Sequence, residues 1–68
     1  MTLSARNLIK GIVKEVKKGQ VMAEAIVEIA PGVEITSAIT TNSVEKLGIA
    51  AGKEVTVVIK ATSVMLDA

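Results

Sequence analysis

The chain has 68 residues, half of them apolar, and its eight basic and seven acidic side chains give a formal net charge of +1. It has no cysteine and no histidine, which excludes disulfides, Cys/His metal cages, and thiol or imidazole catalysis. This length allows one domain, spanning residues 1–68, that buries only about 60% of its unfolded surface, so the apolar excess predicts an oligomer.

Cellular location and macromolecular partners are also constrained by the composition. No apolar run reaches the ~18 residues of a membrane span, and residues 1–6 lack the apolar core of a signal peptide. We therefore expect a cytoplasmic protein without a membrane partner. The chain lacks a basic excess and has no aromatic residue on which bases stack, so we expect no nucleic-acid partner.

Alternating apolar and polar residues predict strands in the first half of the chain. After the polar stretch Ser4-Ala5-Arg6-Asn7, a strand over 12–16 and a turn at 17–20 lead into the clearest strand, 21–29. These two strands form a predicted hairpin. The Ala30-Pro31-Gly32 break ends the second strand, and alternation resumes over 33–39.

One short helix interrupts the strand pattern. Asn42 and Glu45 have the spacing of a capping box, and Gly48 stands where a C-cap glycine is expected, so the helix is predicted at about 43–47. A strand over 55–60 follows. Residues 64–66 are apolar and can form a short last strand.

A local repeat flanks the predicted helix. The frame Ile-Ala-x-Gly-x-Glu-(Ile/Val)-Thr begins at Ile29 and again at Ile49, and we interpret both copies as turn-to-strand entries of one sheet. About five short strands, with one helix between the third and the fourth, predict a mainly β fold. The expected architecture is a small OB-like Greek-key β-barrel.

The sequence offers little for catalysis. Nucleotide-binding glycine motifs are absent, and Glu24 and Glu28, four residues apart, fit a solvated strand face. The carboxylates are dispersed. We therefore predict no catalytic residue, no metal-ion site and no enzyme activity.

Hydrogen-bond donors, in contrast, gather at three places. They precede the first strand, surround the helix start and follow the fourth strand: Ser4 and Arg6; Thr40, Thr41 and Ser43; Lys60, Thr62 and Ser63. Taken singly, each group has a structural explanation, as a solvated tail, a helix cap or a strand end. Taken together, they suit a compact anion.

Three motifs carry a resemblance to a known family. "SARN", "ITTNSVEKLGIAAGKEV" and "VIKATSVML" follow one another in the order and at the intervals of the molbindins, the molybdenum-pterin-binding proteins. The resemblance covers nearly the whole chain. It implies an OB-like barrel with strands shared between subunits, a hexamer assembled as a trimer of dimers, and molybdate or tungstate bound at subunit interfaces. We predict no cation and no organic cofactor beside the oxyanion.

The resemblance also implies site residues. It places Ser4, Ala5 and Arg6 of one subunit against the oxyanion, together with residues of a neighbouring subunit: Thr40, Ser43, Lys60 and Ala61. Ala5 and Ala61 would contribute backbone N–H groups, and Ser63 is added to the set. Some relatives have proline where this chain has Thr62. The expected function is storage or buffering of the oxyanion, and the alternative is an oligomeric interaction module without physiological oxyanion binding.

Overall fold

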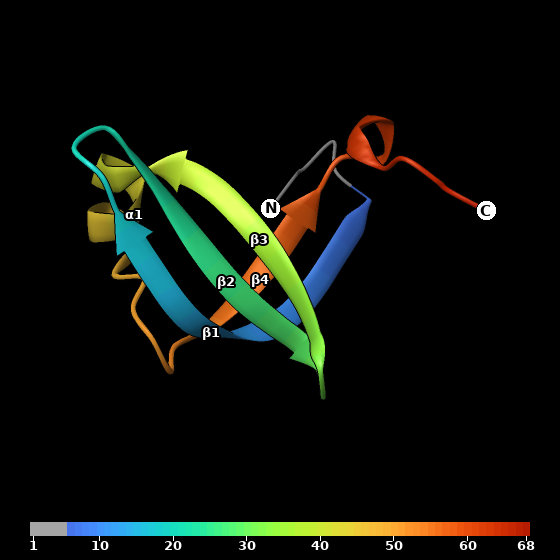
Figure 1. Cartoon of the computed structure of the whole chain (residues 1–68), viewed down its shortest axis with the longest axis horizontal. Helices are drawn as coiled ribbons and strands as arrows, with labels where there is room; N and C mark the ends of the chain where they lie inside the picture. The colour runs from blue at the N-terminus through green and yellow to red at the C-terminus, as the bar shows by residue number, and fades with distance from the viewer. Residues whose placement is uncertain (1–5) are drawn as a thin grey trace.

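Figure 1 shows a bent antiparallel sheet with one short helix, in a computed structural model that describes residues 6–68. Its elements, in chain order, are β1 (Asn7–Lys18), β2 (Met22–Ala30), β3 (Val33–Thr40), α1 (Thr41–Leu47), β4 (Glu54–Ile59) and the 3₁₀ turn η1 (Ala61–Ser63). The mainly β fold class is confirmed.

The strands lie in the order β3-β2-β1-β4. The first three strands form a meander and the fourth returns beside the first, which is the Greek-key arrangement that the sequence predicts. Within residues 6–68 the sheet does not close, because β3 and β4 are both edge strands.

The long strand β1 serves two partners. Asn7–Ile12 pairs with β4, whereas Ile12–Lys18 pairs with β2, with a bulge between Val13 and Glu15. A side chain at Gly11 would place its Cβ 2.6 Å from Val27 Cγ1 and 2.8 Å from the Glu28 carbonyl oxygen. Only glycine therefore lets β1 pass so close to β2 at the point where it changes partners.

The predicted cap of the helix is wrong, and the helix begins earlier than expected. Thr40, not Asn42, is the N-cap residue, and its hydroxyl accepts the Ser43 N–H at 3.1 Å. The last residue of β3 is itself extended, so strand and helix join without a linker. The predicted C-cap is confirmed, because Gly48 is left-handed with φ of 65°.

The two copies of the local repeat do form turn-to-strand entries. Gly32 and Gly52 have φ of 76° and 92°, values that favour glycine, and they precede β3 and β4 respectively. Both edge strands of the sheet are thus entered through the same kind of turn.

The predicted fifth strand is wrong for the isolated chain. After η1 the last residues run away from the sheet (Figure 1), and Met65 and Leu66 are 91% and 94% exposed. A strand needs a neighbour for its N–H and C=O groups, and this segment has none in its own chain among the described residues.

The core of the described residues is small. The buried apolar side chains are Val13, Ala23, Ala25, Val27 and Val44. An apolar cleft of about 240 Å³ remains open between β3 and β4. No helix in residues 6–68 is long and apolar enough to cross a membrane.

Candidate functional site

The two cationic residues of the predicted site, Arg6 and Lys60, lie next to each other. The ladder between β1 and β4 ends at the pair Asn7 and Ile59. Arg6 comes directly before Asn7 and Lys60 directly after Ile59, so both lie at this end of the sheet on neighbouring strands. Asn7 fixes this end of the sheet, because its Nδ2 donates to the Ile59 carbonyl oxygen at 3.2 Å. Arg6 and Lys60 are both exposed. Like charges on adjacent strands repel each other, so this position favours an anion.

The chain turns sharply just after Lys60. The Ser63 N–H bonds the Lys60 carbonyl oxygen at 2.9 Å, and the Val64 N–H bonds that of Ala61 at 3.3 Å. Ala61 stands at the start of this turn. We call Arg6, Lys60, Ala61 and Ser63 the basic end.

A second group lies at the start of α1. The hydroxyls of Thr40 and Ser43 are 2.7 Å apart and hydrogen-bonded. Two hydroxyls carry two protons and this bond uses one of them, so one O–H remains for an external acceptor. Helix capping and ligand binding are therefore compatible at these residues. We call Thr40 and Ser43 the hydroxyl end.

Thr41, another hydroxyl residue of this segment, has a structural role. Its Oγ1 donates to the Gly19 carbonyl oxygen at 2.8 Å, and its N–H donates to the Val21 carbonyl oxygen at 2.8 Å. These two bonds tie the start of the helix to the β1–β2 turn. They hold the neighbouring hydroxyl end in place.

The structure separates the hydroxyl end from the basic end within one chain. The basic end adjoins Asn7, at the start of β1, while Thr40 pairs with Met22, just beyond the other end of β1. Twelve residues of strand separate them along β1, a contour of about 36–40 Å along a bent path. Lys60 and Ala61 are thus grouped with Arg6 and not with the hydroxyl end. Ser4 and Ala5 lie outside the described residues.

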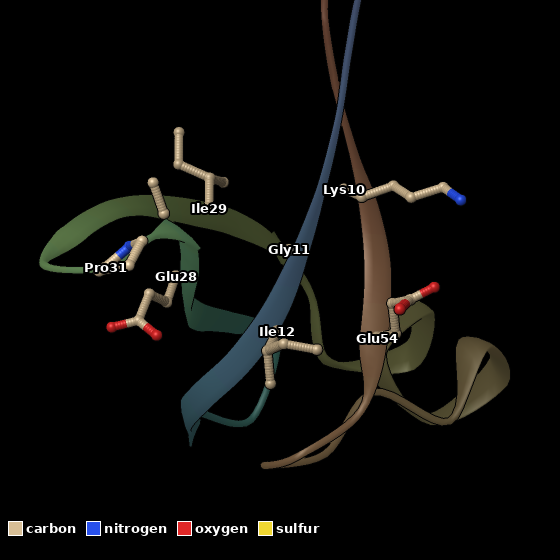
Figure 2. A pocket seen from close by; sticks show the side chains of 8 residues that line it. Lys10, Gly11, Ile12, Glu28, Ile29, Pro31 and Glu54 are labelled. Atoms are coloured by element: carbon tan, nitrogen blue, oxygen red, sulfur yellow. The ribbon is translucent and has the colours of Figure 1, made fainter.

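A separate hollow of about 280 Å³ lies where β1 leaves β2 (Figure 2). Glu28 and Glu54 line it together with a single cationic residue, Lys10. Two carboxylates make this hollow unfavourable for an oxyanion. Within residues 6–68, the acidic side chains form no group that could hold a metal ion.

The comparisons with known proteins agree with this architecture. The family model described as the TOBE domain matches residues 3–66, so the chain belongs to the TOBE domain family. Within that family it is similar to "Molybdenum-pterin-binding protein 3" of Clostridium pasteurianum, with 53% identity over 66 residues that make up 97% of each chain. The predicted resemblance to the molbindins is confirmed.

Solved structures show the same fold. "MopII" from Clostridium pasteurianum superimposes with a TM-score of 0.90 at 52% identity, covering 98% of this chain and 100% of that one. A molybdate-binding protein from Sporomusa ovata superimposes with a TM-score of 0.93 at 38% identity over the whole of both chains. The open four-stranded sheet therefore matches the form of single chains in OB-like structures of this family.

Proposed function

We propose that this protein binds molybdate or tungstate at sites formed between copies in a homo-oligomer, and that it stores or buffers these oxyanions in the cytoplasm. The observation that carries the proposal is the side-by-side placement of Arg6 and Lys60 at the end of β1 and β4. Relatives named for molybdenum-pterin binding and a structural neighbour named for molybdate binding support it.

The chemistry of the two ends fits such an ion. Molybdate at neutral pH is a tetrahedral dianion without protons, so all its oxygens only accept hydrogen bonds. Arg6, Lys60, the Ala61 N–H and the hydroxyls of Ser63 and the hydroxyl end are all donors. None of these groups is a carboxylate. Two unit positive charges match the dianion's charge.

The magnitudes are adequate for binding. One unit charge 4 Å from another contributes about 4 kcal/mol at an effective dielectric constant of about 20, before desolvation. Arg6 adds geometry to charge, because its planar guanidinium donates two parallel hydrogen bonds to neighbouring oxygens. Both cations are exposed in one chain, so burial between copies would strengthen their interaction with the ion.

Assembly belongs to the same proposal. The five buried side chains among the described residues are small, which makes a poor core for a chain that is half apolar. A hexamer, assembled as a trimer of dimers, is the form that we propose, in keeping with the family resemblance. Binding rather than catalysis is the proposed activity.

Calorimetric titration with molybdate at low sulfate tests the proposal. We expect Arg6→Ala and Lys60→Ala each to weaken binding at least tenfold, because each removes one of the two adjacent cations. The β-sheet signal in circular dichroism should stay unchanged. Lys14→Ala is the matched control, since Lys14 is an exposed lysine at the bulge of β1.

The same titration distinguishes the alternative function. A parent protein that assembles but gives no heat with molybdate or tungstate would be an oligomeric interaction module. If either alanine variant binds molybdate as tightly as the parent, the replaced residue does not contact the ion.

A further inference from the structure

The local repeat of the sequence extends from the two turns into the proposed site. Its two copies continue in register beyond the shared frame, as far as a matching serine at Ser43 and Ser63. This alignment places Thr40 of the hydroxyl end on Lys60 of the basic end. The two ends of the site therefore occupy equivalent positions in two copies of one sequence unit.

The backbone has the same conformation at the two equivalent positions. Thr40 ends β3 with φ of −69° and ψ of 147°, and Lys60 follows β4 with φ of −68° and ψ of 138°. Each is the N-cap of the helix that comes next, α1 or η1. The Ser43 N–H bonds back to the Thr40 hydroxyl. The Ser63 N–H bonds back to the Lys60 carbonyl oxygen. Both ends of the site are thus built on one kind of strand-to-helix junction.

The adjacent strand distinguishes the two junctions. At the basic end, Arg6 lies beside Lys60, because the register of β1 and β4 continues one residue past the last pair. At the hydroxyl end, the register of β2 and β3 pairs Met22 with Thr40. Met22 therefore has the position relative to Thr40 that Arg6 has relative to Lys60. A neutral thioether stands where the other junction has a guanidinium.

Met22 lies close to the hydroxyls of this junction. The Thr41 N–H donates to the Val21 carbonyl oxygen at 2.8 Å, so Val21 and Thr41 occupy a hydrogen-bonded position of the ladder. The next pair, Met22 and Thr40, is then a non-hydrogen-bonded pair, whose Cα atoms are about 4.5 Å apart and whose side chains share one face. Met22 is 50% exposed, so its side chain also forms part of the surface beside the hydroxyl end.

We propose that Met22 is a specificity-determining residue of the oxyanion site. Its side chain covers the hydroxyl end and favours large, weakly hydrated dianions, such as molybdate and tungstate, over sulfate. This inference rests on the proposed function, because it concerns the same site.

The selectivity follows from hydration. Sulfate and molybdate carry the same charge, but sulfate is smaller and therefore holds its water more strongly. The Met22 side chain has no hydrogen-bond donor that could replace the water it displaces from the ion. The free energy of losing that water is larger for the smaller ion, so Met22 disfavours sulfate. A thioether side chain is also flexible and polarizable, which lets it pack against a larger ion.

The neutrality of Met22 limits the charge of the site. Arg6 and Lys60 supply two positive charges, which match a dianion, and the residue equivalent to Arg6 at the hydroxyl end adds none. A third cation would attract any dianion by Coulomb's law, whatever its size. A neutral side chain at this position therefore preserves discrimination by size and hydration.

Calorimetric titration of Met22 variants with molybdate and with sulfate tests this role. Met22→Gln keeps the length of the side chain and adds an amide donor. We expect the ratio of molybdate to sulfate affinity to fall at least tenfold, chiefly through tighter sulfate binding. Met22→Leu keeps an apolar side chain and should retain the parent's ratio. Val33→Gln is the matched control, because Val33 is 48% exposed at the other end of β3 and its replacement should leave both affinities unchanged.

Met22→Lys tests the contribution of charge. We expect it to raise the affinity for both ions and to lower the ratio between them. The affinities should also fall more steeply with added salt than those of the parent, because a further charged contact is screened.

Three results would overturn the role of Met22. They are a parent ratio retained in Met22→Gln, an equal fall of the ratio in Met22→Leu, and an equal fall in the Val33→Gln control. A parent that binds molybdate and sulfate equally would refute the specificity role but leave the proposed function in force. A parent that binds neither ion would refute the proposed function itself.

Discussion

Thr40 shows how one side chain can cap a helix and also belong to the proposed site. Its hydroxyl accepts the Ser43 N–H and bonds the Ser43 hydroxyl, so it caps α1 while orienting the second hydroxyl of the pair. Asn42 has the right spacing for a capping box, but it lies inside the helix. Sequence spacing alone could not decide between them, because the cap depends on where β3 stops being extended.

Replacing Thr40 should therefore be costly, and replacing Asn42 should not. We expect Thr40→Ala to lower the free energy of unfolding by about 1 kcal/mol, the usual cost of losing an N-cap hydroxyl. Thr40→Ser keeps the hydroxyl and should retain most of the stability. Urea unfolding at one fixed protein concentration measures the difference. An equal loss of unfolding free energy in Asn42→Ala would mean that Thr40 is not the capping residue.

Gly11 is required by a close approach rather than by backbone conformation. An alanine Cβ there would lie 2.8 Å from the Glu28 carbonyl oxygen, an atom of the backbone that cannot move aside cheaply. We expect Gly11→Ala to lower the free energy of unfolding by about 1–3 kcal/mol, as overpacking in a core does. Urea unfolding checks this, and a variant as stable as the parent would show that β1 and β2 separate without cost.

The alternation of apolar and polar residues predicts three of the four strands almost completely. Residues 21–29, 33–39 and 55–60 were expected to be extended and fall almost wholly within β2, β3 and β4. The first half of β1 was not predicted as a strand, because Gly11 interrupts its apolar pattern. The fifth strand could not be predicted correctly from one chain, since Val64–Leu66 pairs with no strand within residues 6–68.

Asn7 is a positioning residue that the sequence did not predict. Its side chain bonds the Ile59 carbonyl oxygen and so clamps the ends of β1 and β4, where Arg6 and Lys60 emerge. The polar stretch that contains it was the only signal in the sequence. We expect Asn7→Ala to weaken molybdate binding several-fold by calorimetry, while Asn42→Ala leaves binding unchanged.

Faster amide hydrogen exchange at Lys60 and Ala61 in the Asn7→Ala protein would accompany this loss, because the clamped ends fray more often. Unchanged exchange together with unchanged affinity would mean that the ladder alone holds the two cations in place.

We expect the stability of the whole molecule to depend on assembly. In the part of the chain that the structure describes, the buried side chains are three valines and two alanines, and the edge strands and the last residues expose further apolar surface. The set of site residues could be proposed from sequence motifs, but their separation into two ends follows from the length and the register of β1. No pattern in the sequence reveals that separation.

An oligomer of six 7.0 kDa chains should have a mass of about 42 kDa by light scattering. We expect no folded monomer at micromolar concentration, and a thermal midpoint that rises with protein concentration, because folding and association are coupled. A folded monomer whose midpoint is independent of concentration would remove the basis for sites between copies.

Selectivity among oxyanions follows from a site made only of donors. Much phosphate carries a proton at neutral pH, and the proposed contacts include no carboxylate that could accept it, so phosphate should bind poorly. Sulfate has no proton but is smaller, which leaves donors unpaired at about 1–3 kcal/mol each when they are buried. Ligands stabilise the assembly in proportion to their affinity, so thermal midpoints should rise most with molybdate and tungstate, less with sulfate and least with phosphate. Equal rises with phosphate and molybdate at matched ionic strength would indicate a general anion patch instead of a site shaped for a large tetrahedral dianion.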